Sequence, residues 1–289
     1  MAEIAEGDPA AAYLRGLREQ FDRARPAGDQ PPLGVTEAER IQEQLRQYVE
    51  PASRLAAQPT LVAGVDVSYD KASEQVVAAA VLIDPATGEL RESAVVHGEA
   101  AFPYVPGLLG FREVPILIEA LAGLAGRPDV VVCDGYGLAH PRRFGLACHL
   151  GVVTGLPTFG VAKTPFVAGY TTPGRRRGEW SPLCDGDEVL GRVLRTQTDV
   201  KPVFVSVGHR ISLDEATEIT LGLCHRYRLP ETTRAADHLS RKVLRCLATS
   251  AEGSRDDLAR PRPKIHRSVE VRINPSSDDT VDVAGAVRP

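Results

Sequence analysis

The stretch that decides the fold is VVVCDGYGLAHPRRFGLACHLGVVTGLPTFGVAKT, residues 130–164. It opens with the apolar run Val130–Cys133 and ends with a second one, Thr158–Ala162, followed by Lys163 and Thr164. Short, uninterrupted β-branched runs are typical of parallel strands that are covered on both faces. A helix is predicted between them, over 141–154. A strand, a helix and a strand in this order predict a right-handed crossover between parallel strands.

Polar residues follow both predicted strands directly. Asp134 ends the first strand, Lys163 ends the second, and His140 precedes the predicted helix. Open α/β sheets bind their ligands at the carboxyl ends of the strands, and the N–H groups at a helix N-terminus can hold a phosphate. A carboxylate, an ammonium and an imidazole at one sheet end therefore indicate chemistry on an anionic substrate. Simple capping of the helix is the alternative for His140.

The rest of the chain completes an α/β pattern. Three strands precede this stretch, over 61–69, 76–83 and 90–97, and two more follow it, over 189–196 and 203–207. Helices are predicted over 36–49, 112–125, 212–227 and 231–248, with capping boxes at Thr36–Glu39 and Ser212–Glu215. A three-stranded antiparallel meander followed by parallel βαβ units predicts a mixed five-stranded sheet flanked by helices. This is the layout of ribonuclease-H-like nucleases.

Two acids are expected to meet on the central strands of this sheet. Asp66 lies within the first predicted strand, between Val65 and Val67, where an unpartnered carboxylate is costly. If that strand neighbours Val130–Cys133, Asp66 approaches Asp134, and a divalent cation relieves their repulsion. A strand-edge or turn-capping role is the alternative for Asp66. Glu113 could reach the same place, although by itself it reads as a first-turn helix acid.

A histidine near the C-terminal end is harder to interpret. His238 lies in the last predicted helix, where a surface or satisfied core position is the more common role for a single histidine. Its neighbour Asp237 points to a different helical face, so we do not expect Asp237 to share the site.

Composition limits the class of protein. The chain has 289 residues, 43% of them hydrophobic, and a formal net charge of −4. No apolar run approaches the roughly 20 residues of a membrane helix, and no secretory signal is visible. The five cysteines form no C-x-x-C pair, as expected of reduced thiols in the cytoplasm. Arginines cluster between residues 140 and 201, which fits either a groove that contacts phosphates or a solvated surface.

Six motifs, in order along the chain, resemble the endonuclease V family. They are AGVDVSYD (63–70), FPYVPGLLGFRE (102–113), CDGYGLAHPRRFGLACHLG (133–151), GVAKT (160–164), VSVGHR (205–210) and YRLPETTRAADHL (227–239). The resemblance covers residues 35–247 and implies a ribonuclease-H-like nuclease that needs Mg²⁺, with Mn²⁺ as a substitute. Its implied substrate is DNA with deoxyinosine or another deaminated base. The implied cut falls at the second phosphodiester bond 3′ to the lesion and leaves 3′-hydroxyl and 5′-phosphate ends.

The resemblance also implies roles for individual residues. The implied metal-binding acids are Asp66, Glu113 and Asp134, and the implied catalytic set adds His238 and Lys163. Tyr104 matches the residue that fills the place of the displaced base. The other implied substrate-binding residues lie near the phosphate or line the inosine pocket with their backbones: His140, Gly107, Gly135 and Gly137. An inserted aromatic side chain suits such a role, because extruding a poorly paired base costs little.

Domain organisation and rival functions complete the expectations. We expect an N-terminal extension over 1–33 that is partly disordered, a nuclease domain over 34–249, and a disordered tail over 250–289, in a monomer without membrane contact. The first rival is a ribonuclease that acts on inosine-containing RNA. The second is a non-catalytic nucleic-acid-binding module of the same fold, which would not need clustered acids. A small-molecule enzyme is disfavoured by the lack of a cofactor motif.

Overall fold

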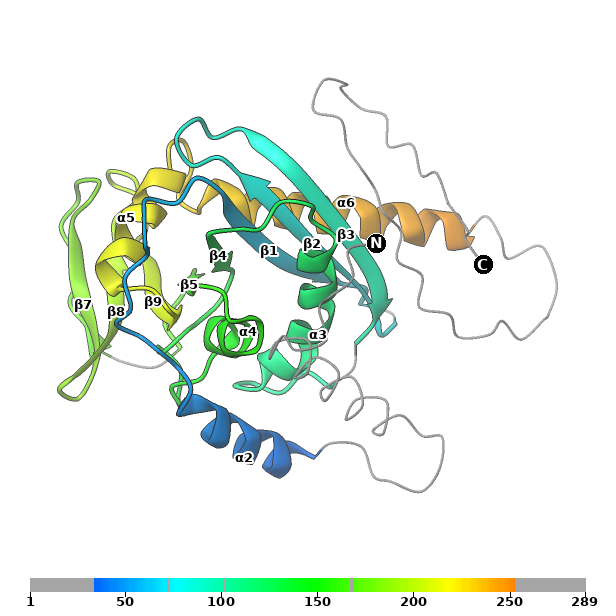
Figure 1. Cartoon of the computed structure of the whole chain (residues 1–289), viewed down its shortest axis with the longest axis horizontal. Helices are drawn as coiled ribbons and strands as arrows, with labels where there is room; N and C mark the ends of the chain where they lie inside the picture. Colours follow the sequence, from blue (N-terminus) through cyan, green and yellow to red (C-terminus); the bar gives the residue numbers. More distant parts are fainter. Residues whose placement is uncertain (1–33, 72, 101, 167–168, 253–289) are drawn as a thin grey trace.

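The computed structural model describes residues 34–252 except 72, 101 and 167–168 (Figure 1). The predicted extension over 1–33 and residues 253–289 of the predicted tail lie outside the described residues, while residues 250–252 belong to the last helix. Within the described part, no helix is long and apolar enough to cross a membrane.

One mixed sheet runs through this part of the molecule (Figure 1). Its strands are β1 (Val62–Tyr69), β2 (Gln75–Ile83), β3 (Leu90–Glu99), β4 (Val130–Cys133), β5 (Thr158–Ala162), β6 (Gly169–Tyr170), β7 (Trp180–Asp185), β8 (Glu188–Leu194) and β9 (Val203–His209). They lie in the order β3-β2-β1-β4-β5-β9-β8-β7-β6. β1 pairs with β2, and β2 with β3, in antiparallel fashion, whereas β1, β4 and β5 are parallel. The predicted mixed α/β sheet is confirmed.

The sheet continues beyond its five predicted strands. β9 pairs antiparallel with β5, and β8, β7 and β6 follow outward from it. The strands predicted over 189–196 and 203–207 are β8 and β9. β7 is not among the predicted strands, because Pro182 lies at its centre and proline is normally excluded from a paired strand. Here proline is tolerated, because the short β6 pairs only with Leu183 and Cys184 of β7.

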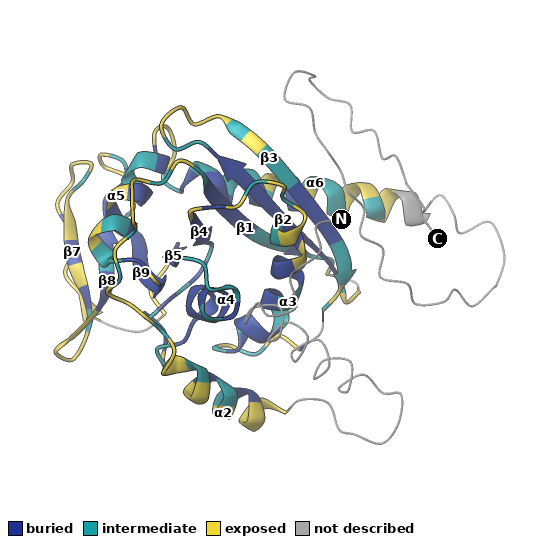
Figure 2. Ribbon diagram, in the orientation of Figure 1, coloured by how far each residue is buried: buried dark blue, intermediate teal, exposed yellow. Residues whose placement is uncertain are grey.

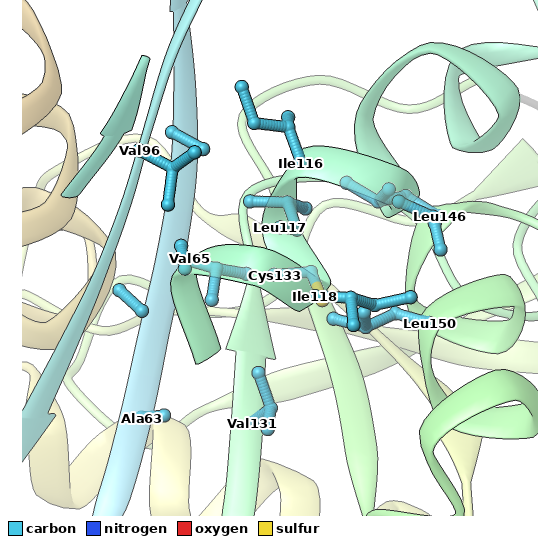
Figure 3. Close-up of a cluster of buried hydrophobic side chains, with 14 of the residues drawn as sticks. Ala63, Val65, Val96, Ile116, Leu117, Ile118, Val131, Cys133, Leu146 and Leu150 are labelled. Carbon is cyan, nitrogen blue, oxygen red and sulfur yellow. The ribbon is translucent and has the colours of Figure 1, made fainter. Parts of the chain in front are cut away.

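Helices cover both faces of the sheet (Figure 2). They are α2 (Val35–Arg46), α3 (Leu109–Ala122), α4 (Leu146–Thr154), α5 (Leu213–Leu223) and α6 (Glu231–Glu252). On one face, Ala63, Val65, Val131 and Cys133 pack against α3 and α4 in a continuous apolar cluster (Figure 3). On the other face, α5 packs on β4, β5 and β9, and α6 packs on β2 and β3. α2 lies outside both layers and contacts α4 and the chain before α3.

Side-chain alternation along β1 decides which helix meets each functional residue. Ala63 and Val65 face α3. Gly64 faces α6, where a Cβ atom would lie 2.3 Å from the backbone carbon of Thr232. Only glycine permits this approach, so α6 lies directly on β1. Because successive strand residues point to opposite faces, Asp66 follows Gly64 toward α6, and Tyr69 follows Val65 toward α3.

Three helix starts differ from the prediction. α3 begins at Leu109 rather than 112. α4 begins at Leu146 rather than 141, because Arg143 adopts a positive φ of 53° that a right-handed helix cannot contain. α2 begins after Gly34, so Thr36 lies inside the helix and the predicted capping box is absent. Glu39 pairs with Arg142 instead. The capping box at Ser212–Glu215 is confirmed by reciprocal hydrogen bonds.

Candidate active site

Three charged residues meet at the carboxyl ends of the central parallel strands. Val65 of β1 pairs with Cys133 of β4, so Asp66 and Asp134 follow side by side. Cys133 in turn pairs with Gly160 of β5, which places Lys163 at the same sheet end. The Nζ atom of Lys163 lies 2.5 Å from Oδ2 of Asp134. The structure thus brings together the two predicted strand acids and the predicted lysine.

The Asp66 carboxylate is largely desolvated and is held by a serine of α6. The Ser240 hydroxyl donates to Oδ2 of Asp66 at 2.9 Å, and the hydroxyls of Ser240 and Ser68 lie 2.7 Å apart. Burial is the main reason that the pKa of Asp66 rises from 3.8 to about 6, and the negative charges of Asp134 and Asp237 add to this rise. Asp66 lies within the central strand β1 and, with Asp134, forms an acidic cluster, so the strand-edge or turn-capping alternative is wrong.

Glu113 reaches this cluster from the opposite face of the sheet. α3 begins at Leu109, so Glu113 lies in its second turn and is not a first-turn acid. Its side chain is buried, and Tyr69 of β1 donates a hydrogen bond to Oε1 at 2.6 Å. Desolvation raises the pKa of Glu113 to about 8, and the charges of Asp66 and Asp134 contribute to the rise. Glu113 is therefore a buried acid that feels both strand carboxylates.

Asp237, which we did not expect at the site, lies closer to it than His238 does. Asp237 is half-buried on α6, and its charge contributes to the raised pKa of Asp66. It also pairs with Arg241 at 2.8 Å. His238 is exposed and makes no hydrogen bond or ion pair with the described residues. Asp237 and His238 do lie on different faces of α6, but it is Asp237 whose charge acts on Asp66, so the expectation that Asp237 lies outside the site is not met.

The acidic cluster offers the kind of ligand atoms that a hard divalent cation prefers. Its potential ligands are all carboxylate oxygens, which Mg²⁺ and Mn²⁺ prefer. Burial is the main cause of the raised pKa values of Asp66 and Glu113, and the charges of the neighbouring acids add to it. Within the described residues, no three histidine, cysteine or acidic side chains are close enough to hold an ion as they stand. Instead, the carboxylate of Asp134 forms an ion pair with Lys163, and the carboxylate of Glu113 accepts a hydrogen bond from Tyr69.

Tyr104 projects from a loop that the sequence marks as a turn. We call residues 102–108 the Tyr104 loop. The Leu108 N–H donates to the Val105 carbonyl at 2.9 Å, and Gly107 between them has a φ of 83°. Proline followed by a glycine with positive φ is the signature of a type II turn. Tyr104 is 70% exposed at the start of this turn, and its insertion into a duplex stays a prediction.

His140 holds this loop in place. Its Nε2 atom lies 3.0 Å from the carbonyl oxygen of Gly107, while its Nδ1 atom accepts from the backbone N–H of Arg142 at 3.2 Å. Nε2 must therefore carry the proton, because a carbonyl oxygen can only accept. Burial and the nearby Arg142 lower the pKa of His140 to about 4, so the ring is neutral. A contact between His140 and a phosphate stays a prediction.

The two glycines after Asp134 have different environments. A Cβ atom on Gly137 would lie 1.9 Å from the carbonyl oxygen of Val207, and the Gly137 N–H donates to the Ser206 hydroxyl at 2.8 Å. Gly135 has room for a methyl group, with its nearest neighbour at 3.6 Å. Gly137 therefore fixes the loop against β9. Its role in a base pocket, like that of Gly135, stays a prediction.

Phe166 was not singled out from the sequence. Its ring stacks on Tyr136 with centroids 5.2 Å apart and lies 5.5 Å from the ring of His140. A phenylalanine after GVAKT carries no sequence signal of its own, because only the fold brings it beside the loop that follows β4.

Comparison with known proteins decides the family. Residues 43–238, which include β1, α3, β4, β5 and the start of α6, match the family model of endonuclease V. The chain belongs to the endonuclease V family. It is therefore an endonuclease, a hydrolase of the same kind as its relatives. The endonuclease V of Nocardia farcinica is 56% identical over 214 residues, which cover 74% of this chain and 94% of that protein.

Solved structures of endonuclease V share the fold. The crystal structure from Streptomyces avermitilis matches with a TM-score of 0.72 at 53% identity, over 75% of this chain and 96% of that one. The endonuclease V of Ciona intestinalis was solved in complex with a 24-mer DNA that contains an inosine followed by a ribo-adenosine. It matches with a TM-score of 0.67 at 29% identity, over 74% of this chain and 98% of that one.

Proposed function

We propose that this endonuclease V cleaves DNA that contains deoxyinosine. The cut would fall at the second phosphodiester bond 3′ to the lesion and leave 3′-hydroxyl and 5′-phosphate ends. The observation that carries the proposal is the convergence of Asp66, Asp134 and Lys163 at the ends of three adjacent parallel strands, with the buried Glu113 beside them. The Ciona relative, solved with inosine-containing DNA, supports the choice of substrate.

The carboxylates would hold Mg²⁺, with Mn²⁺ as a substitute. Asp66 and Asp134 are the proposed principal ligands and Glu113 a nearby one. We add Asp237 to this set, so that α6 contributes to the site through Asp237 rather than through the expected catalytic His238. When bound, such an ion lowers the pKa of a coordinated water and offsets charge on the departing oxygen. This fits the cluster, because a dication would offset the cost of burying the carboxylates of Asp66 and Glu113 and the smaller repulsion from their acidic neighbours.

The protein's own groups orient these acids and the phosphate. Ser240 fixes one oxygen of Asp66, and Tyr69 fixes one oxygen of Glu113, so each carboxylate keeps its other oxygen in a set direction. Lys163 pairs with Asp134 and would exchange part of that contact for the scissile phosphate. The backbone of Lys163 is anchored, since Arg228 donates to its carbonyl oxygen at 2.6 Å.

The test is a gel assay on a 5′-labelled oligonucleotide with a single inosine. Wild type should cut it with Mg²⁺ and leave it intact with EDTA, and the length of the product gives the position of the cut. Asp134→Ala should abolish cleavage while binding is partly retained. Asp187→Ala removes an exposed acid from the turn between β7 and β8 and serves as the control. Retained turnover in Asp134→Ala would refute the role of Asp134.

Inosine-containing RNA is a second candidate, because the DNA bound by the Ciona relative carries a ribonucleotide directly after the inosine. The same assay distinguishes the two substrates when three oligonucleotides are compared at equal salt. One is entirely deoxy, one has a single ribonucleotide after the inosine, and one is entirely RNA. Faster cleavage of the all-deoxy strand supports DNA as the substrate. A requirement for the 2′-hydroxyl supports RNA.

A further inference from the structure

A buried glutamine of α2 is bound to the Tyr104 loop. Gln42 is 1% exposed, and its Nε2 atom donates to the carbonyl oxygens of Gly107 at 2.9 Å and Phe144 at 3.1 Å. Its Oε1 atom accepts from Nε of Arg142 at 2.5 Å. A buried primary amide with all these contacts is strongly fixed in position, because leaving any of its partners unpaired is costly.

The carbonyl group of Gly107 is the centre of this network. It accepts from three donors, which are Nε2 of Gln42, Nη2 of Arg142 at 3.0 Å and Nε2 of His140 at 3.0 Å. A carbonyl oxygen has two lone pairs, so this one is fully occupied. The turn that follows Tyr104 is therefore held from three sides, and the plane of its last peptide cannot rotate freely.

An ion pair and an apolar contact complete the attachment. Glu39 of α2 pairs with Nη1 of Arg142 at 3.0 Å, and so sets the direction of the guanidinium that reaches Gly107. Ala38 of α2 is fully buried against Phe102, Leu108 and Phe111, and Val105 packs on the same cluster. α2 thus contacts the loop on both sides of Tyr104, while the tyrosine itself stays exposed.

We propose that Gln42 is a positioning residue for base recognition, which acts by fixing the Gly107 carbonyl and through it the Tyr104 loop. This inference rests on the proposed function. Gln42 lies just outside residues 43–238, the part of the chain that matches the family. Its effect should appear as selectivity for inosine, because a loop that is free to shift would present Tyr104 in many positions, while the acidic cluster stays intact.

The experiment compares kcat/KM for an inosine duplex with that for the same duplex carrying adenine. In Gln42→Leu, which keeps much of the side-chain volume, the ratio of the two values should fall about tenfold because three hydrogen bonds are lost. Gln44→Ala, on the exposed face of the same helix, is the matched control and should leave the ratio unchanged. An unchanged ratio in folded Gln42→Leu overturns the proposal.

A second readout separates positioning from general loss of structure. A 2-aminopurine placed beside the inosine reports base unstacking by its fluorescence, in the presence of EDTA and without cleavage. Wild type should increase the fluorescence of inosine DNA. At saturating protein, the increase caused by Gln42→Leu should be smaller by a factor of about five or more. If wild type itself neither unstacks nor prefers inosine, the proposed function fails. If wild type does both and Gln42→Leu matches it, only the inference about Gln42 fails.

Two further variants keep the test decisive. If Gln42→Leu fails to fold, Glu39→Ala can be used instead, because it removes only a partly exposed ion pair. It should lower the ratio of kcat/KM for the inosine duplex to that for the adenine duplex about twofold. The double variant Gln42→Leu/Tyr104→Ala should be no less selective than Tyr104→Ala alone, because Gln42 acts through the loop that carries Tyr104. If the two substitutions instead lower the selectivity for inosine independently, so that their effects multiply, Gln42 does not act through the Tyr104 loop.

Discussion

Replacing Glu113 by glutamine should stabilise the metal-free protein, and the gain should grow with pH. The pKa of Glu113 is raised from 4.5 to about 8, chiefly by burial. Below pH 4.5 the carboxyl is protonated in both the folded and the unfolded chain, so wild type and variant should have similar free energies of unfolding. As pH rises toward 8, the unfolded chain releases this proton while the folded chain keeps it. The stability of wild type therefore falls with pH.

The size of the effect follows from the pKa shift. Glu113→Gln should gain less than about 1 kcal/mol at pH 5 and about 4 kcal/mol at pH 8, since each pKa unit corresponds to about 1.4 kcal/mol. The amide oxygen can still accept from Tyr69, so the hydrogen bond to the tyrosine is preserved.

The assay is urea unfolding of both proteins in EDTA across this pH range. Glu119→Gln changes an exposed acid of the same helix and should show no gain that depends on pH. A Glu113→Gln gain that is the same at every pH would show that the Glu113 carboxyl is already ionised in the folded protein. That result would refute the reasoning from burial.

The remaining predictions concern α6 and the loop after β4. Asp237→Asn should lower kcat on inosine DNA at least tenfold, whereas His238→Ala should change it less than about twofold. The reverse pattern would restore His238 to the site. Gly137→Ala should lower the free energy of unfolding by about 3 kcal/mol, because its methyl group would meet the Val207 carbonyl, a backbone atom that cannot move aside. Gly135→Ala, which has space for a methyl group, should cost much less in the same urea titration.

The central strands could be predicted from the sequence because their patterns are local. The apolar runs of β4 and β5 and the alternation along β1 are visible without knowledge of the fold. Parallel pairing then places Asp66 beside Asp134. β7 could not be predicted, since the tolerance of Pro182 depends on how short its neighbour β6 is. The start of α4 was missed because no sequence rule requires a positive φ at Arg143.

The site was only partly predictable, for a related reason. Asp237 and His238 are adjacent, and the sequence gives the period of a helix but not the face on which it packs. That face is decided by Gly64, which lets α6 touch β1 at Thr232. Ser240 and Tyr69 were missed because a hydroxyl acquires its role only from the carboxylate that folding places beside it.

The contact between Ser240 and Asp66 joins residues that are 174 positions apart. Contacts this distant in sequence form late, after the loops between them have closed. During synthesis β1 leaves the ribosome long before α6, so a nascent or truncated chain would have its first acid without the helix that orients it. Completion of the acidic cluster is thus tied to synthesis and docking of α6, and copies without this helix would hold an unfinished nuclease site.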